Sequence, residues 1–375
     1  MVLAFVSLRR YNTRGIVSVS TELRVDRAWV EVDLANLVEN ARAVRHAAHD
    51  APLLPMVKAD GYGLGAVQVV RALETIEPWG FGVATVSEGV ELRRAGVTRP
   101  IVVFTPARVD DLSRLGENGL TAVLDDPAVI DECGTDQPYH CEVDTGMGRA
   151  GIRWNDAAGL RALARNPPQG VFTHLHSADT SEDAVNVQLG RFREVVSSLA
   201  ERPRFVHVAN SAGAWRVDEH FDLVRPGIFL YGGQVGKDLP KPKPVASLRA
   251  VVVSVRRLEA GDTVSYGAEW TAAEPTTVGT LSIGYADGVP RAVQDRASVI
   301  VAGRRRPIVG RVTMDMTVVD LGPDDPGGVG DVATLIGTDG DERIALDEFA
   351  GWAGTISYEI LVKLGDRLPR VYRGP

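Results

Sequence analysis

The chain is short of cysteine, of long apolar runs and of basic charge. Its 375 residues include only Cys133 and Cys141 as cysteines, too few for a disulfide framework, so we expect a cytoplasmic setting. No stretch approaches 18 apolar residues, so no transmembrane helix is predicted. Lysine and arginine number 41 against 49 acidic residues, whereas proteins that bind phosphate backbones normally carry a basic excess. We therefore expect neither a membrane nor a nucleic acid as partner.

What is present is an ordinary globular composition, with 45% hydrophobic and 24% charged residues. Such a chain can bury a large core, and its length indicates two domains or more. The N-terminus opens with a short apolar run followed by arginines, the reverse of the order in a secretory signal. Residues 1–24 are therefore predicted to be an N-terminal extension.

Residues 25–244 alternate short apolar runs with amphipathic helical segments, a pattern typical of βα units around a parallel sheet. About eight units fit, the number that closes a (β/α)₈ barrel. An open doubly wound sheet is the competing interpretation, but no G-x-G-x-x-G follows the first strand. The predicted strands are 53–58, 80–86, 101–105, 120–124, 139–144, 171–176, 205–209 and 223–230.

Residues 245–375 carry strands without long helices between them, which predicts a smaller, mostly β C-terminal domain. Glycine-containing turns separate several of these strands. The predicted strands are 248–258, 276–283, 298–301, 307–312, 317–321 and 332–336, with one helix at 346–352.

A barrel presents its working residues where its strands end. The first strand ends at Lys58, and a buried ammonium costs several kcal/mol unless it is paired or neutralised. A Schiff base with a cofactor aldehyde resolves this cost, and a lysine that reaches to the barrel mouth is an equally good interpretation. Ser211 follows the seventh strand and Gly227 lies near the start of the eighth, and barrels often bind phosphate near these two strands. Together with Tyr62 they predict a phosphate cup and suggest pyridoxal 5′-phosphate (PLP).

Strands five and six end in further polar groups. Glu142 shares a face with His140 and Asp144, while Arg149 follows in a glycine loop, suited to a carboxylate or to a salt bridge with Asp144.

His174 and His176 form an H-x-H pair that could bind a metal together with His207. A histidine that only stacks or hydrogen-bonds is the favoured interpretation of this pair. Tyr266 and Tyr285 lie beside glycines, where tyrosines usually serve packing.

Five segments together resemble the alanine racemase family, over nearly all of the chain from about residue 27. They are VKADGYG at 57–63, DTGMGR at 144–149, SYG at 265–267, GYADG at 284–288 and MD at 314–315.

The resemblance implies a homodimeric, PLP-dependent isomerase that interconverts L- and D-alanine and supplies D-alanine for peptidoglycan. Lys58 would hold PLP as a Schiff base and act as one of two acid/base groups, the other being Tyr266, which reaches the barrel of the partner. The further cofactor-binding residues would be Tyr62, His174, His207, Ser211, Arg225, Gly227 and Ile228. Arg225 would face the pyridine nitrogen, supported by His207. Arg149 and the backbone N–H of Met314 would bind the substrate carboxylate, with Glu142, Tyr285 and Asp315 in supporting roles; no metal is expected.

Two departures from the family pattern stand out. Glu142 occupies the position of a lysine that is often carbamylated, and we expect its carboxylate to serve Arg149 instead. Asp366 aligns with a tyrosine that touches the phosphate and narrows the mouth of the site.

Four alternatives remain open at this point. They are a racemase of serine or of a larger amino acid, a decarboxylase, a metal-dependent hydrolase and a non-catalytic PLP carrier. Arg225 speaks against the decarboxylase, and the β domain with Tyr266 speaks against the carrier.

Overall fold

The structure is a computed structural model that describes residues 27–134, 137–323 and 328–374. The predicted extension, residues 1–24, lies outside them. The described chain forms two compact units. The first holds residues 32–246 apart from the gap at 135–136, together with 355–363 and 372–374. The second holds residues 27–31, 247–354 apart from the gap at 324–327, and 364–371. None of the helices in the described ranges has the length and apolar character needed to cross a bilayer.

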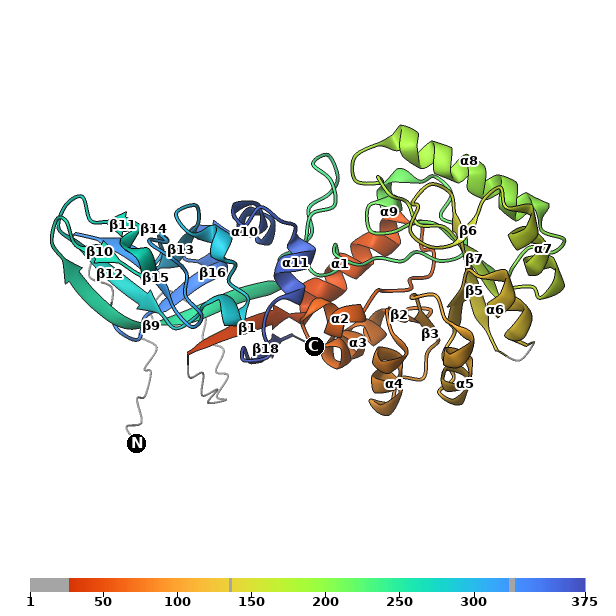
Figure 1. Cartoon of the computed structure of the whole chain (residues 1–375), viewed down its shortest axis with the longest axis horizontal. Coiled ribbons are helices and arrows are strands. Elements are labelled where there is room, and N and C mark those ends of the chain that lie inside the picture. Colours follow the sequence, from red (N-terminus) through yellow and green to blue (C-terminus); the bar gives the residue numbers. More distant parts are fainter. Residues whose placement is uncertain (1–26, 135–136, 324–327, 375) are drawn as a thin grey trace. The chain divides into compact units, whose positions relative to one another are not determined.

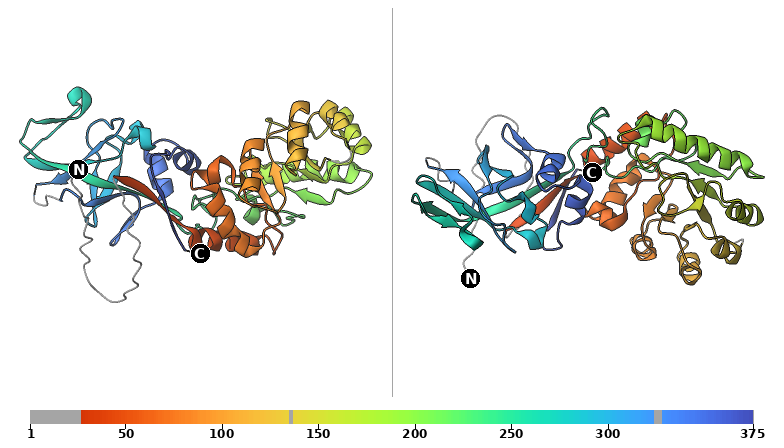
Figure 2. Two further views of the ribbon diagram at one scale, coloured as in Figure 1. Left: turned by 90° about the horizontal axis from the view of Figure 1, so that it is seen from below. Right: turned by 45° about the horizontal axis from the view of Figure 1, so that its top comes forward.

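The first unit is built from short parallel strands with helices on their outside, as Figures 1 and 2 show. Several of its helices begin at a side chain that accepts a backbone N–H bond, which stabilises the helix start. These N-cap residues are Asp33, Thr85, Asp126, Asp156 and Ser181. The elements are α1 (Leu34–Ala47), α2 (Lys58–Tyr62), α3 (Ala66–Leu73), η1 (Glu74–Ile76), β2 (Phe81–Val83), α4 (Val86–Arg94), β3 (Ile101–Val103), α5 (Val109–Glu117), β4 (Ala122–Leu124), α6 (Pro127–Glu132), β5 (Tyr139–Asp144), β6 (Ile152–Arg153), α7 (Ala157–Arg165), β7 (Gly170–Phe172), α8 (Glu182–Ser198), β8 (Phe205–His207), α9 (Gly213–Arg216) and α11 (Ser357–Val362).

The strands close into a parallel barrel. β2 pairs with β3, and β4, β5, β7 and β8 pair in that order. Parallel bridges complete the circle by joining Leu53 to Val224, Met56 to Gly82 and Val102 to Thr121. Backbone hydrogen bonds from the segment at 222–225 to residues 206 and 209 connect β8 to the last segment. The predicted (β/α)₈ barrel is therefore confirmed.

The barrel interior is filled by one apolar layer. Its members come from five different strand segments and are all at least 98% buried: Leu54, Val102, Val123, Phe172 and Leu223. Side chains from alternate strands fill barrels in such layers, so the interior is a packed core and the mouth is left for chemistry.

Most strands end earlier than the sequence predicts. The runs predicted at 53–58 and 223–230 form only isolated bridges, and Lys58 already begins α2. Pro226 lacks the N–H that a ladder needs, so the buried run after it continues as turns rather than as a strand. Burial rather than strand structure explains the apolar character of this segment.

The second unit is an antiparallel sheet with the order β14-β13-β16-β9-β1-β18; β12 pairs with β9 and β15, and β17 pairs with β16. The predicted strand at 307–312 is wrong, because Ala302 and Gly303 form a tight turn with positive φ and start β14 earlier. The elements are β1 (Ala28–Asp33), β9 (Ala246–Leu258), β10 (Thr263–Val264), η2 (Tyr266–Ala268), β11 (Trp270–Thr271), β12 (Thr276–Leu281), η3 (Tyr285–Asp287), η4 (Arg291–Val293), β13 (Ser298–Val301), β14 (Arg304–Pro307), β15 (Thr317–Gly322), β16 (Val332–Asp339), β17 (Glu342–Ile344), α10 (Leu346–Trp352) and β18 (Arg370–Arg373).

Candidate active site

Lys58 lies at the start of an unusual left-handed turn. Ala59, Asp60 and Gly61 all have φ between 51° and 61° and ψ between 45° and 51°, a conformation that costs L-residues about 1–2 kcal/mol each. The turn is held in part by Glu88, whose Oε1 accepts the N–H of Ala59 at 2.8 Å. Backbone strain of this kind persists where surrounding structure enforces it, and such strain is concentrated at functional sites.

The surroundings of Lys58 favour its uncharged amine. Burial lowers the pKa of Lys58, the nearby charge of Arg149 lowers it further, and Glu88 partly opposes both. A lysine with a lowered pKa presents a free amine closer to neutral pH, which both a Schiff base and proton transfer require.

A small polar cup lies beside the lysine turn. The Ser211 Oγ accepts the backbone N–H of Gly227 at 2.8 Å, and a Cβ at Gly227 would collide with the hydroxyl of Tyr62. The Tyr62 ring stacks on Tyr231 with centroids 4.4 Å apart. Burial raises the pKa of Tyr62, so its hydroxyl stays a donor. The cup, with the buried Ile228 next to it, offers the hydroxyl donors that a phosphate needs.

Arg225 is a buried cation in the same barrel. Its Nη1 donates to Nδ1 of His207 at 2.8 Å, and its Nη2 donates to the carbonyl of Thr173 at 2.8 Å. Burial lowers the pKa of Arg225 to about 10, which still leaves it charged at neutral pH. Its Nε makes no hydrogen bond within the described residues and so keeps its donor capacity.

Burial holds the pKa values of His140, His174 and His207 well below that of a free histidine, which favours their neutral forms. The two ring nitrogens of His207 are taken by Arg225 and by His140, whose Nδ1 lies 2.9 Å from His207 Nε2. Burial and the charges of Arg225, Arg149 and Lys58 lower the pKa of His174 to about 3. Across the described ranges, no three His, Cys, Asp or Glu residues are placed to hold a metal ion.

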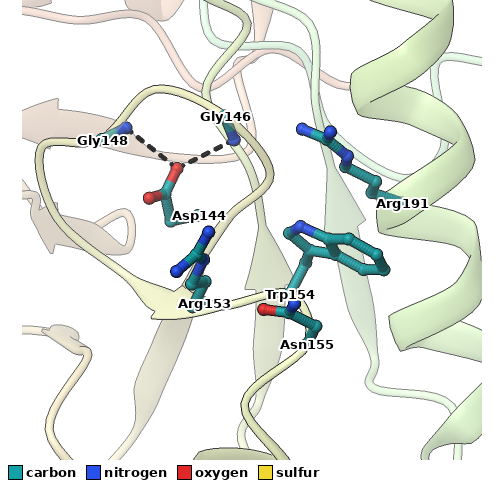
Figure 3. A pocket seen from close by; sticks show the side chains of 7 residues that line it. All are labelled: Asp144, Gly146, Gly148, Arg153, Trp154, Asn155 and Arg191. Atoms are coloured by element: carbon teal, nitrogen blue, oxygen red, sulfur yellow. Dashed lines mark hydrogen bonds between the residues drawn. The ribbon is translucent and has the colours of Figure 1, made fainter.

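Hydrogen bonds within the loop that carries Arg149 stabilise its conformation. Asp144 Oδ1 accepts the backbone N–H groups of Gly146 at 2.9 Å and Gly148 at 3.0 Å, as Figure 3 shows. The same residues line a pocket of about 450 Å³ with Arg153, Trp154, Asn155 and Arg191. Asp144 thus holds the loop instead of pairing with Arg149, which makes no ion pair within the described residues.

Glu142 is buried on β5 and acts on Arg149 at a distance. Burial raises the pKa of Glu142, and the charges of Arg149 and Arg225 lower it. No ion pair within 4 Å joins Glu142 to Arg149 in the described part of the chain. The support of Arg149 by this carboxylate stays a prediction, and in this structure it would be electrostatic, without a direct contact.

We predict that Glu142→Gln raises, several-fold or by about 1 kcal/mol, the KM for the substrate whose carboxylate Arg149 would bind, with little change in kcat, because Arg149 loses a favourable charge. Since burial raises the pKa of Glu142, the wild-type KM should also rise as the pH falls and the carboxylate is protonated. The KM of Glu142→Gln should not show this rise. Glu194→Gln, on the exposed face of α8, is the control; equal KM profiles for all three proteins would contradict the prediction.

The remaining predicted residues belong to the second unit and are exposed there. Tyr266 is 72% exposed, Tyr285 43% and Met314 52%. The segment that carries Met314 is bonded to the turn that carries Tyr285, since the N–H of Tyr285 donates to Thr313 O and that of Ala286 to Met314 O.

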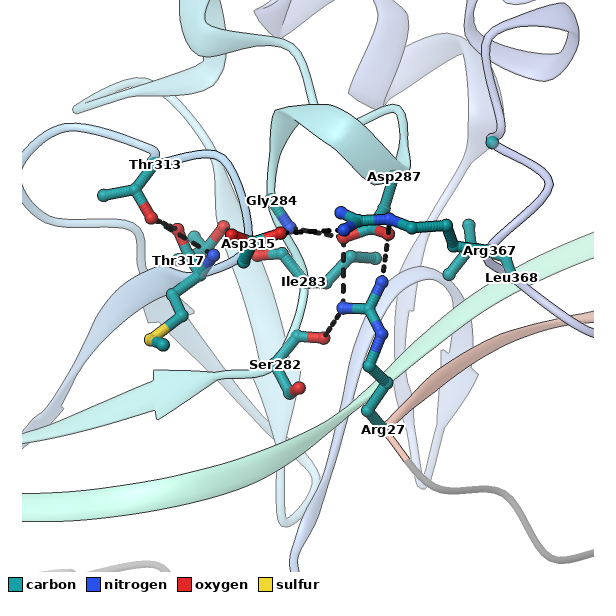
Figure 4. A network of polar contacts seen from close by, with 12 residues as sticks. Arg27, Ser282, Ile283, Gly284, Asp287, Thr313, Asp315, Thr317, Arg367 and Leu368 are labelled. Carbon is teal, nitrogen blue, oxygen red and sulfur yellow. Dashed lines mark hydrogen bonds and ion pairs between the residues drawn. The ribbon is translucent and has the colours of Figure 1, made fainter.

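Asp287 is the buried centre of a polar network under this turn (Figure 4). It is fully buried and accepts hydrogen bonds from Arg27, from Arg367 Nε at 3.0 Å and from the Gly284 N–H at 3.0 Å. Arg367 Nη1 continues the network to Asp315 Oδ1 at 2.8 Å. The network thus joins the turn of Tyr285 to the residue next to Met314.

We predict that Asp287→Ala destabilises the protein by about 1–3 kcal/mol, because it removes the buried acceptor of the Gly284 N–H and of two partly exposed arginines. Asp315→Ala removes an exposed carboxylate from the same network and should cost less than about 1 kcal/mol. Urea unfolding of both variants measures the difference, and equal losses would contradict the central place of Asp287.

Asp366 is exposed in the second unit, and its place at the mouth of the site stays a prediction. A tyrosine near the C-terminus that lies beside the cup is Tyr358 of α11. Its ring centroid is 6.1 Å from that of Tyr62. Sequence reasoning missed Tyr358 because its helix is short and the contact is made across most of the chain.

Comparison with known proteins gives a consistent result. The sequence models of the alanine racemase N-terminal and C-terminal domains match residues 32–235 and 245–372. A protein named alanine racemase from Symbiobacterium thermophilum is 40% identical, covering 92% of this chain and 97% of the relative. The structure resembles alanine racemase from Bacillus anthracis with bound L-Ala-P (TM-score 0.86, 34% identity, 92% and 95% covered). It also resembles the Bartonella henselae enzyme with covalently bound pyridoxal phosphate (TM-score 0.85, 31% identity, 92% and 99% covered).

Proposed function

The chain belongs to the alanine racemase family, and from that premise we propose that it interconverts L- and D-alanine with PLP as cofactor and two protein bases. The observation that carries the proposal is the meeting of three features in one barrel. They are Lys58 with its lowered pKa, the cup of Tyr62, Ser211 and Gly227, and the buried cation Arg225.

The residues of the barrel fit PLP group by group. Lys58 would hold the aldehyde carbon, the cup with Ile228 would hold the phosphate, and Arg225 would donate through Nε to the pyridine nitrogen. His207 keeps the Arg225 guanidinium in place, and the neutral His174 would lie beside the ring. When bound, PLP withdraws electrons from the amino acid and acidifies its Cα–H.

Inverting the configuration at Cα requires two bases on its opposite faces. One base removes a proton from Cα, and the other returns a proton to it. Lys58 is the first and Tyr266 the second. Arg149 and the Met314 N–H would grip the substrate carboxylate and so aim Cα at both bases. Because Arg225 is a cation without a proton to spare, it would leave the ring nitrogen unprotonated and so limit side reactions.

We infer that the enzyme is a homodimer with shared active sites. Lys58 and Tyr266 belong to different compact units, and the second unit presents Tyr266, Tyr285 and Met314 with exposed side chains. Exposed apolar groups of this kind mark an interaction surface. A second copy of the chain supplies a barrel for this surface, in agreement with the family resemblance.

We further infer that the enzyme works in the cytoplasm, where its D-alanine would serve peptidoglycan synthesis. Cys133 and Cys141 are both free thiols, which suits a reducing compartment.

The test of the proposed function is racemisation by the purified protein loaded with PLP. L-alanine and D-alanine, supplied separately, should each approach an equal mixture of the two enantiomers, followed by chiral chromatography. L-serine and a larger amino acid serve as comparison substrates. Faster racemisation of either than of alanine, or none of alanine, would overturn the assignment.

A further inference from the structure

The backbone conformation next to Tyr266 is far more constrained than the exposed position of the Tyr266 side chain requires. Tyr266 lies in the loop of residues 265–269 that joins β10 to β11. Ser265, immediately before it, has φ 65° and ψ −174°, a region that is essentially restricted to glycine. A non-glycine residue remains there only where neighbouring structure enforces it.

The hydroxyl of Ser265 is one of the contacts that enforce this backbone. Its Oγ donates to the carbonyl of Arg311 at 2.7 Å. Gly310 permits the close approach, because a Cβ there would lie 2.9 Å from the Val264 carbonyl and 3.2 Å from the Ser265 Cβ. The first residue of the loop is thus tied to the segment at 310–311.

The side chain of Arg311 ties down the other end of the loop. Its guanidinium forms an ion pair with Glu269 and lies over Gly267, where a Cβ would be 3.2 Å from Cζ. Gln294 Nε2 donates to the second oxygen of Glu269 at 2.9 Å. Both ends of the loop are therefore fixed to one residue, and Tyr266 lies between them.

We propose that Ser265 is a positioning residue for Tyr266. Ser265 fixes the direction in which the exposed phenol of Tyr266 extends from the second unit. The inference rests on the proposed function, in which Tyr266 is the base supplied to a second copy of the chain. A phenol that is oriented in advance can approach the substrate Cα without a conformational search. Small misplacements of a base lower the reaction rate by large factors.

A two-residue hairpin turn does not explain the conformation of Ser265. The tight turn at Ala302 and Gly303 also has positive φ, but a two-residue hairpin requires that geometry. The loop at 265–269 is longer than such a turn, and Gly267 and Ala268 in it also have positive φ. Ala302 provides a control position, because it is a non-glycine residue with positive φ that is not among the proposed site residues.

The experiment compares Ser265→Gly, Ser265→Ala and Ala302→Gly. Glycine suits the native backbone of position 265 but removes the hydroxyl, so the apoprotein of Ser265→Gly should unfold at the same or a higher temperature than wild type. Its kcat with PLP should nevertheless fall by about 10- to 100-fold, with KM unchanged. Ser265→Ala should lose both stability and kcat, and Ala302→Gly should keep the wild-type kcat.

Isotope exchange separates positioning from general damage. In deuterated water, Ser265→Gly should still exchange the Cα hydrogen of the enantiomer that Lys58 deprotonates, while inversion falls. Wild-type kcat in Ser265→Gly would overturn the proposal, as would equal loss of exchange from both enantiomers. If wild type itself fails to racemise alanine, the proposed function has failed instead, so the two failures are distinguishable.

Discussion

Lys58→Ala is expected to abolish racemisation, with a loss of at least about 10⁴-fold in kcat. The substitution removes one of the two bases, and general acid–base catalysis contributes about 10²- to 10⁴-fold. It also removes the amine that holds the cofactor covalently. The absorption band near 420 nm that a lysine-bound PLP gives should disappear with the activity. Chiral chromatography and an absorption spectrum of the same sample measure both effects.

Lys58→Arg is the matched variant, because it keeps a long basic side chain at the start of the left-handed turn but cannot form a Schiff base at neutral pH. It should be as inactive as Lys58→Ala. Both variants should unfold at temperatures near that of the wild-type apoprotein, since the turn is held by Glu88 and not by the lysine side chain. Retention of more than about a tenth of the wild-type activity by either variant would contradict the role of Lys58.

Tyr266→Phe should lower the rate of racemisation by at least about 10³-fold while the protein still binds PLP. The substitution removes only the phenolic oxygen, and none of the residues proposed to hold the cofactor is changed. Because Lys58 remains, Cα-hydrogen exchange should continue from one enantiomer and be lost from the other. Proton NMR in deuterated water distinguishes the two directions.

Tyr285→Phe is the matched control for Tyr266→Phe. Tyr285 is also an exposed tyrosine of the second unit, but it is given a supporting role and not that of a base. Its variant should keep symmetric exchange from both enantiomers. Asymmetric exchange in Tyr285→Phe, or symmetric exchange in Tyr266→Phe, would show that the second base has been misassigned.

Much of the barrel could be predicted from the sequence because its signals are local. The bounds of β5 agree with the predicted range 139–144, since this segment has a periodic apolar pattern ended by polar and turn residues. The prediction of the last barrel strand, residues 223–230, was wrong, because its apolar residues are buried without forming a ladder of strand hydrogen bonds. Apolar character reports burial, and a buried turn has the same composition as a buried strand.

The site was predictable where a residue type is unusual for its position, and unpredictable where contacts join distant segments. A lysine that ends a buried strand stands out in the sequence, as Lys58 does. The left-handed turn after Lys58 does not stand out in the sequence, because Ala59 and Asp60 have no local preference that demands this conformation. Tyr358 beside Tyr62 and the hydrogen bond of His140 to His207 depend on how the chain closes on itself.

The central claim is that one active site combines Lys58 of one chain with Tyr266 of another, and hybrid dimers test it most directly. The inactive Lys58→Ala and Tyr266→Phe proteins are unfolded together in equal amounts, refolded and loaded with PLP. Half of the dimers would be hybrids with one intact site of two, so the account predicts about a quarter of wild-type activity. A mixture that stays as inactive as its two components would contradict the shared site.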